Sequence, residues 1–347
     1  MAQPSTEIVL DRLRDQAQDA VWAAIAPGAR CALLGYPNHT NPGDHAIWIA
    51  AQTLLERIGA DVAYACSWRD YSREALGKAV AAGAHIVFTG GGNFGDLWPA
   101  THALREAVFR DFVGVPIVQL PQTVHFTRSE ALGVTRRSLE RHGNAVLLVR
   151  DAPSLELARE SFDVDVRLAP DLAFACPLEP PTDPPATDIL WIAREDRESC
   201  GLNPDRVPDG VWRVDWNLRD AERRVLGGEA PAAGALLELI ERNRRLTKRV
   251  GDDRWRELAE IRAELSSARL ERALRLLRRG RVITTDTLHA HILGLRLGIP
   301  TVITDTRYGK LGATFDTFTH AVPLAHWADT PGHALGLAVH AVPRSSG

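Results

Sequence analysis

Two segments of the sequence share the pattern Asn-x-Gly-Asp, and both carry groups that could take part in chemistry. The first reads PNHTNPGDHAIW from residue 37 and contains Asn41 and Asp44. A carboxylate or an amide in a polar loop can orient a hydroxyl group or accept its proton. The structural alternative is that Asp44 caps the helix that is predicted by the apolar periodicity of the following residues.

The second segment reads TGGGNFGDLW from residue 89 and places a run of glycines before Asn93 and Asp96. Backbone N–H groups of Gly91 and Gly92 can form a concave site for a phosphate or a carboxylate. The spacing matches neither the dinucleotide-binding glycine pattern nor a P-loop. The alternative is a plain turn that requires positive φ angles.

Polar or charged side chains follow other apolar, strand-like runs. Gln122 comes after a Leu-Pro pair in QLPQTVHF, where we predict a turn, and its amide could contact a substrate. Arg150 in VRDAPS, Arg194 in WIAREDRE and Lys310 in YGKLG are cations that can bind a carboxylate or a phosphate. The alternatives for these cations are structural ion pairs and solvated surface charges.

The segment TTDTLHAHILGLRLGIP, from residue 284, contains the strongest catalytic candidate. Asp286 is predicted to cap a helix, which places His289 in the first turn, where free N–H groups and the helix dipole favour an anion. Histidine exchanges a proton near neutral pH, so His289 is a candidate general acid. No HExxH motif is present, and we predict no metal site.

The elements that must position these residues alternate between short apolar strands and amphipathic helices. This pattern predicts an α/β fold with parallel sheets covered on both faces. Strands are expected at residues 31–36, 61–65, 85–89, 116–120, 145–149, 166–168, 188–193, 211–216, 281–285 and 299–305. Most candidate residues therefore follow the carboxyl end of a strand, where open α/β sheets bind ligands.

Residues 177–187, PLEPPTDPPAT, contain five prolines in eleven positions and are predicted to form an extended linker. They divide the chain into an N-terminal domain, 1–176, and a C-terminal domain, 188–347, with a cleft between them. An arginine-rich segment, 254–280, is predicted to be an amphipathic surface helix with solvated arginines. We expect the last helix of the chain to pack back on the N-terminal domain.

The composition narrows the class of protein. The chain has 347 residues, of which 41 are basic and 44 acidic, and its net charge of −3 gives no indication of a nucleic-acid-binding surface. No stretch has the length and apolarity of a membrane span, and the N-terminus has the pattern of a helix and not of a signal peptide. Four widely spaced cysteines indicate reduced thiols in a cytoplasmic protein.

Seven segments together resemble the polysaccharide pyruvyl transferase family, and they occur in the family's order over nearly the whole chain. They are PNHTNPGDHAIW, TGGGNFGDLWP, QLPQTVHF, VRDAPSLELA, LAPDLAFA, ITTDTLHAHILGLRLGIP and YGKLGATFDTF. The resemblance implies two Rossmann-like domains that face each other across a cleft, similar to glycosyltransferases of the B fold. It also implies transfer of a pyruvyl group from phosphoenolpyruvate to two hydroxyls of a sugar, forming a cyclic ketal in polysaccharide or glycoconjugate biosynthesis, without a cofactor.

The same resemblance suggests roles for the candidate residues. The glycine run and the helix start near Asp286 would hold the negative groups of phosphoenolpyruvate, assisted by Arg194. His289 would protonate the methylene carbon, and Asp44 or Asp96 would orient or deprotonate a hydroxyl of the acceptor, which could be a sugar or a lipid-linked oligosaccharide. The further candidate contacts to substrate are Asn41, Asn93, Gln122, Arg150 and Lys310.

One position departs from the family pattern. The family commonly has Arg-Leu-His where this chain has Thr-Leu-His, with Thr287 in place of the arginine. That arginine is thought to hold the phosphate or carboxylate of the donor, so Arg194, Arg150 or Lys310 would have to replace it, unless the donor differs. Two alternatives therefore stay open: a B-fold glycosyltransferase that uses a nucleotide-sugar, and a sugar- or phosphate-binding homologue without catalytic activity.

Overall fold

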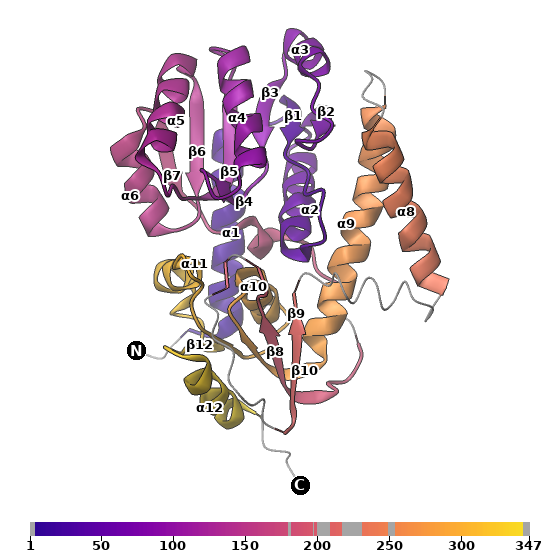
Figure 1. The fold of residues 1–347 in the computed structure, drawn as a ribbon, viewed down its shortest axis with the longest axis vertical. Coiled ribbons are helices and arrows are strands. Elements are labelled where there is room, and N and C mark those ends of the chain that lie inside the picture. The colour runs from indigo at the N-terminus through magenta and orange to yellow at the C-terminus, as the bar shows by residue number, and fades with distance from the viewer. Residues whose placement is uncertain are drawn as a thin grey trace.

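The computed structural model describes residues 4–179, 182–196, 198–199, 209–216, 231–248 and 254–342. Two parallel β-sheets lie one above the other, each flanked by helices (Figure 1). The N-terminal sheet has the order β2-β1-β3-β5-β6-β7, with β4 pairing with β5, and the C-terminal sheet has the order β12-β11-β10-β8-β9. This architecture is the α/β fold that the sequence predicts.

The strands have the following bounds. Those of the N-terminal sheet are β1 (Arg30–Leu34), β2 (Asp61–Cys66), β3 (His85–Phe88), β4 (Gly91–Phe94), β5 (Ile117–Val124), β6 (Ala145–Val149) and β7 (Asp165–Leu168). Those of the C-terminal sheet are β8 (Thr187–Ala193), β9 (Val211–Asp215), β10 (Gly280–Thr285), β11 (Thr301–Ile303) and β12 (Ala325–Trp327). All ten predicted strands are present, and β4 and β12 are additional.

Two local predictions about the N-terminal sheet are wrong. Residues 91–94 of the glycine run form strand β4 and not only a turn, because they pair in parallel with β5. Strand β5 continues through Pro121 to Val124, so the predicted Leu-Pro turn does not form. The ladder between β5 and β6 shifts register between Gln119 and Gln122, and this bulge accommodates a proline that has no N–H to donate.

The helices cover both faces of the sheets. They are α1 (Thr6–Ala24), α2 (Pro42–Arg57), α3 (Arg73–Ala81), α4 (Pro99–Asp111), α5 (Ser129–His142), α6 (Ala152–Ser161), α8 (Pro231–Thr247), α9 (Trp255–Arg278), α10 (Leu288–Arg296), α11 (Lys310–Thr314) and α12 (Pro331–Ala341), with the 3₁₀ turn η1 (Leu172–Ala175) and the π-helical turn η2 (Phe315–Thr319). Because helices lie on both sides, all eight residues of β5 are buried.

One apolar core joins the two halves of the molecule. It contains Val21 of α1, Leu54 of α2, Leu190 of β8 and Leu293 of α10. Helix α1 runs from the upper half into the lower half in Figure 1 and packs against η1. This shared core holds the two sheets in a fixed relation and so positions any site between them.

Helices α8 and α9 extend from the C-terminal half, and α9 lies alongside α2 (Figure 1). The prediction of solvated arginines is wrong for Arg262 and Arg269, which are 2% and 7% exposed. Arg262 donates to both carboxylate oxygens of Asp70, at 2.8 and 2.9 Å, and Arg269 Nη1 lies 3.0 Å from His45 Nε2. The inner face of α9 is thus a charged contact with the N-terminal half.

The remaining surface elements differ from expectation at one point. Helix α12 packs on β10 and β11 of the C-terminal sheet, and not on the N-terminal half.

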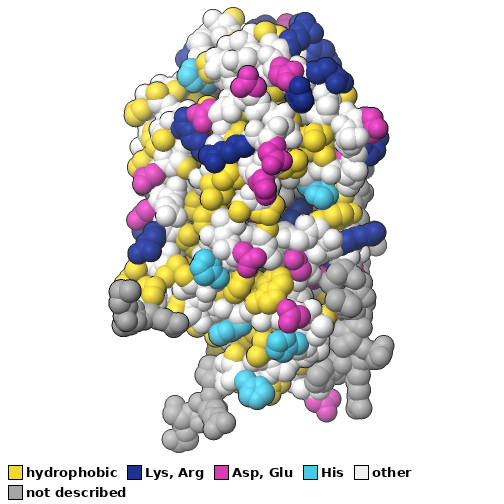
Figure 2. Space-filling model, turned by 90° about the vertical axis from the view of Figure 1, so that its left-hand side faces the viewer, with side chains coloured by type: hydrophobic (Ala, Val, Ile, Leu, Met, Phe, Trp, Pro, Cys, Tyr) yellow, Lys and Arg dark blue, Asp and Glu magenta, His cyan; other side chains and the backbone are white. Residues whose placement is uncertain are grey.

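Cys31, Cys66 and Cys176 are buried and unpaired, whereas Cys200 lies outside the described residues. In the described part of the chain, no helix combines the length and apolarity needed to cross a membrane. The face shown in Figure 2 carries charges of both signs, with Lys and Arg gathered over its upper part.

Candidate functional site

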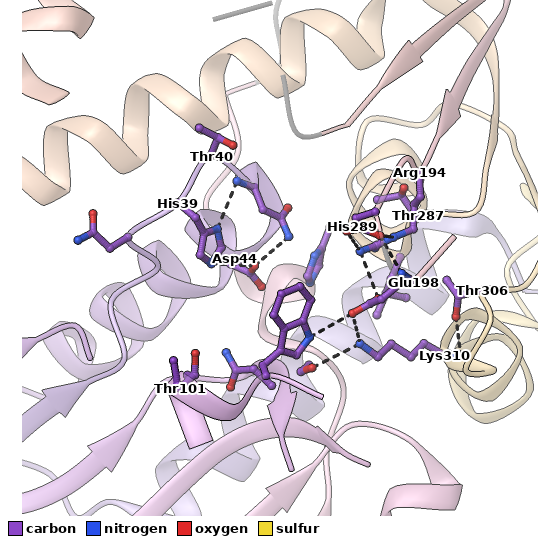
Figure 3. Close-up of a pocket in the computed structure, with 18 of the residues that line it drawn as sticks. His39, Thr40, Asp44, Thr101, Arg194, Glu198, Thr287, His289, Thr306 and Lys310 are labelled. Atoms are coloured by element: carbon purple, nitrogen blue, oxygen red, sulfur yellow. Dashed lines mark hydrogen bonds and ion pairs between the residues drawn. The ribbon is translucent and has the colours of Figure 1, made fainter. Parts of the chain in front are cut away.

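A cavity of about 790 Å³ lies between the two halves. Its walls are the loop from β1 to α2, β4, the start of α4, and the residues that follow β6, β8, β10 and β11. In Figure 3, His39 and Asp44 lie on one side of the cavity, and Arg194, Glu198 and Lys310 lie on the other. The carboxyl edges of two parallel sheets thus bring residues that are distant in sequence to one place.

Most of the predicted site residues line this cavity. They are Asn41, Asp44, Gly92, Asn93, Arg150, Arg194, His289 and Lys310. The other predicted residues, Gly91, Asp96, Gln122 and Asp286, do not belong to its lining.

Two of these outlying residues hold residues of the lining in place. Gln122 Nε2 donates to Asn93 Oδ1 at 2.7 Å, and Asp286 Oδ1 accepts from the backbone N–H of Arg194 at 2.8 Å. The prediction that Asp286 caps α10 is wrong, because Thr287 occupies the N-cap position and Asp286 bonds to the neighbouring strand end. Burial raises the pKa of Asp286 to about 6.

Asp96 points to another part of the N-terminal half. Its carboxylate accepts from the backbone N–H groups of Thr127 and Arg128, at 2.7 and 3.0 Å, and pairs with the Arg128 guanidinium at 3.2 Å. These bonds fix the chain at the start of α5. Of the two candidate aspartates, Asp44 is the one that faces the cavity.

The wall at the start of α2 presents Asp44 beside two polar side chains. Asp44 Oδ2 accepts from Asn41 Nδ2 at 2.8 Å and lies 3.5 Å from His39 Nε2. The helix cap is Asn41, whose Oδ1 accepts from Gly43 N at 3.1 Å, so the prediction of Asp44 as the cap is wrong. Asp44 sits in the first turn and is directed into the cavity.

The opposite wall contains a buried cluster of Lys310, Arg194 and Glu198. Lys310 Nζ donates to Glu198 Oε1 at 2.8 Å, and Arg194 Nη2 lies 3.2 Å from Glu198 Oε2. Burial lowers the pKa of Lys310, although Glu198 opposes that shift. Burial acts to raise the pKa of Glu198, but Lys310 and Arg194 outweigh it and hold that pKa below its ordinary value.

Arg150 and His289 meet at the floor of the cavity around Asp171. Arg150 donates to Asp171 and also, from Nε, to Thr123 at 2.9 Å. His289 Nε2 lies 3.4 Å from Arg150 Nη1 and 3.5 Å from Asp171 Oδ2. Burial alone would raise the pKa of Asp171, but Arg150 and His289 hold it well below its ordinary value.

Two glycines permit close approach at this floor. A Cβ atom on Gly92 would lie 2.9 Å from both Arg150 Nη2 and Lys310 Nζ, and a Cβ atom on Gly43 would lie 2.0 Å from His289 Nδ1. Gly43 therefore lets the two halves meet at His289. Sequence reasoning missed this role because nothing in the sequence shows that His289 packs against residue 43.

Glu198 and Trp98 are cavity residues that sequence reasoning also missed. Glu198 lies in the charged segment WIAREDRE, where it has no feature that separates it from its neighbours. Trp98 Nε1 donates to Glu198 Oε1 at 3.3 Å across the interface between the halves. Arg197 of the same segment lies outside the described residues.

These features define a class of protein: two Rossmann-like domains of the glycosyltransferase B type, with arginine, lysine and histidine in the cavity between them. Comparison with known proteins then identifies the family. The model of the polysaccharide pyruvyl transferase family matches residues 41–308, and the chain belongs to this family.

Individual relatives agree with this assignment. Pyruvyl transferase 1 of Schizosaccharomyces pombe is 29% identical over 85% of this chain and 71% of its own length. EpsO of Bacillus subtilis, a pyruvyl transferase by inference only, is 27% identical over 83% of this chain and 85% of its own length. The crystal structure of a functionally uncharacterized protein of Klebsiella pneumoniae has the same fold, with a TM-score of 0.57 at 15% identity, covering 92% of this chain and 99% of that one.

Proposed function

We propose that this protein transfers the pyruvyl group of phosphoenolpyruvate to two hydroxyls of a sugar acceptor and thereby forms a cyclic ketal. The observation that carries the proposal is the convergence of Arg150, Arg194, Lys310 and His289 in one cavity of a member of this family. Phosphoenolpyruvate bears a phosphate and a carboxylate, and guanidinium and ammonium groups bind both anions. The family name and the name of the fission-yeast relative support pyruvyl transfer as the reaction.

The departure at position 287 is compatible with this donor. The Thr287 side chain is buried and lines the cavity, and its hydroxyl has no hydrogen-bond partner among the residues that the structure describes. The hydroxyl can therefore donate to an oxygen of the donor. Arg194 and Lys310 supply positive charge in the same cavity.

In the proposed reaction, His289 protonates the methylene carbon of phosphoenolpyruvate, which makes C2 electrophilic. The first acceptor hydroxyl forms a bond to C2 and gives its proton to Asp44. The C2–O bond to phosphate then breaks, the second hydroxyl adds to C2, and its proton leaves with inorganic phosphate. The proton on Asp44 returns to His289 through solvent, so the reaction balances without a redox partner. Fixed cations around the phosphate stabilise the charge that develops on it.

The test is release of inorganic phosphate from phosphoenolpyruvate in the presence of a panel of sugars and lipid-linked oligosaccharides. Mass spectrometry of the acceptor should show the gain of a pyruvyl ketal. A thermal-shift panel separates the alternatives: stabilisation by phosphoenolpyruvate supports the proposal, whereas stabilisation by UDP- or GDP-sugars alone would indicate a glycosyltransferase. Binding of phosphoenolpyruvate without phosphate release for any acceptor would indicate a homologue without catalytic activity.

A further inference from the structure

Glu198 places a carboxylate inside the cationic part of the cavity. Its side chain is 5% exposed, and both carboxylate oxygens are in use. Oε1 accepts from Lys310 Nζ at 2.8 Å and from Trp98 Nε1 at 3.3 Å, and Oε2 lies 3.2 Å from Arg194 Nη2. One carboxylate thus occupies donors from three different segments, two in the C-terminal half and one in the N-terminal half.

The cations near Glu198 form the arrangement that an anion requires. Lys310 Nζ and Arg150 Nη2 both lie against Gly92, because a Cβ atom there would be 2.9 Å from each. Arg150 already has Asp171 as its partner, and Arg194 also pairs with Asp196 at 2.6 Å. Lys310 shares its protons between Glu198 and the Gly92 carbonyl, which is 3.4 Å away. A phosphate oxygen accepts hydrogen bonds from ammonium, guanidinium and indole N–H groups in the same way as a carboxylate oxygen.

The segment that carries Glu198 is held through its backbone at both ends of the residue. The Glu198 N–H donates to Asp196 Oδ1 at 3.0 Å, and the Glu198 carbonyl accepts from Arg307 N at 3.0 Å. Rotation about the side-chain bonds can therefore withdraw the carboxylate while the backbone stays in place.

We propose that the Glu198 carboxylate occupies the place of the donor's phosphate and must leave Lys310 and Arg194 before an anionic substrate binds. The identity of that substrate as phosphoenolpyruvate rests on the proposed function, but the competition between two anions for one pair of cations does not. Glu198 thereby sets the affinity of the site. A neutral side chain of the same shape should remove the carboxylate from Lys310 and from one side of Arg194, whose pair with Asp196 at 2.6 Å stays in place.

The test compares Glu198→Gln with a matched control, Glu195→Gln. Glu195 lies in the same segment and at the same cavity, but its side chain is 61% exposed and its ion pair is with Arg213, at 3.9 Å. Isothermal titration calorimetry with inorganic phosphate, and separately with phosphoenolpyruvate, gives the Kd values. Losing one competing charge-assisted contact corresponds to about a tenfold change or more, so E198Q should bind phosphate at least about tenfold more tightly than wild type. E195Q should stay within about twofold of wild type, since exposed ion pairs contribute little.

An equal or weaker affinity of folded E198Q for phosphate would overturn the proposal and make Glu198 a residue that positions Lys310. Circular dichroism and a thermal melt confirm that the variant is folded. The turnover assay separates this result from the function itself. If wild type turns over phosphoenolpyruvate but E198Q has an unchanged affinity for phosphate, the proposal of competition by Glu198 is refuted and the proposed function is supported. If E198Q binds phosphate more tightly but neither protein turns over phosphoenolpyruvate, the competition is supported and only the proposed function is refuted.

Discussion

Gly92 of β4 is a position where one added methyl group should separate ligand binding from folding. A Cβ atom there would lie 2.9 Å from Arg150 Nη2 and from Lys310 Nζ, whereas ordinary contact begins at 3.4 Å, so each cation must retreat by about 0.5 Å (3.4 minus 2.9). Both atoms are the ends of flexible side chains, and Gly92 does not have a positive φ angle. The strand can therefore accept alanine, but the two cations leave the positions in which they face the cavity.

The expected size of the effect follows from one displaced hydrogen bond to a charged group, which contributes about 1.5–3 kcal/mol. Gly92→Ala should therefore raise the KM for phosphoenolpyruvate by about 10- to 150-fold. The free energy of unfolding, measured by urea titration, should change by less than about 1 kcal/mol, because alanine has the better intrinsic fit to a regular element. A folded variant with wild-type KM and wild-type affinity for phosphoenolpyruvate would refute the argument.

Two other glycines serve as controls for this experiment. At Gly90 a Cβ atom would lie 2.4 Å from the Pro121 carbonyl oxygen, which is backbone and cannot retreat, so Gly90→Ala should destabilise the fold by about 1–3 kcal/mol. At Gly77 in helix α3 a Cβ atom meets nothing within 4 Å. Gly77→Ala should therefore stabilise the protein by about 0.5–1 kcal/mol and leave KM unchanged.

Three further perturbations test the candidate site, the contact between α9 and Asp70, and the buried carboxyl group of Asp286. His289→Gln should lower kcat by about 100-fold or more with the melting temperature retained, and normal turnover would eliminate His289 as the acid. Arg262→Met leaves Asp70 buried without its guanidinium partner and should cost about 3–5 kcal/mol of unfolding free energy, whereas Arg275→Met, at an exposed pair, should change it by less than about 0.5 kcal/mol. Burial raises the pKa of Asp286 from 3.8 to about 6, so the native state binds this proton more tightly than the unfolded state, and the contribution of Asp286 to stability should grow as the pH falls from 6 to 3.8. Asp286→Asn should lack this gain, and equal pH profiles of the two unfolding free energies would contradict it.

The strands could be predicted from the sequence because each is a short apolar run, and buried parallel strands require such runs. Strand β4 could not be predicted, because Gly91 and Gly92 have no side chain to produce a pattern. Its formation depends on the edge of β5 beyond the bulge between Gln119 and Gln122. A strand that forms only because the tertiary structure supplies its pairing partner has no recognisable pattern in its local sequence.

The residues at strand ends could be predicted as a group, but their partners could not. Arg194 and Lys310 follow strands in the sequence and do line one cavity. Their shared partner, Glu198, stands among other charged residues, and only the folded chain shows that it is buried while Glu195 is exposed. The buried arginines of α9 were missed for the same reason, since an amphipathic pattern does not reveal a charged partner such as Asp70 on another helix or loop.

The two Asn-x-Gly-Asp segments have the same residue types and different geometries. In the first, Asn41 caps α2 and Asp44 lies in its first turn, so positions three residues apart fall on one side of a helix and both side chains reach the cavity. In the second, Asn93 belongs to strand β4, and the chain leaves the strand at Gly95 with a φ angle of 123°. Asp96 lies in the turn beyond Gly95, and its carboxylate is directed toward the start of α5, where it accepts from Thr127 N at 2.7 Å. The secondary structure around each copy therefore decides which aspartate faces the cavity, and that residue is Asp44.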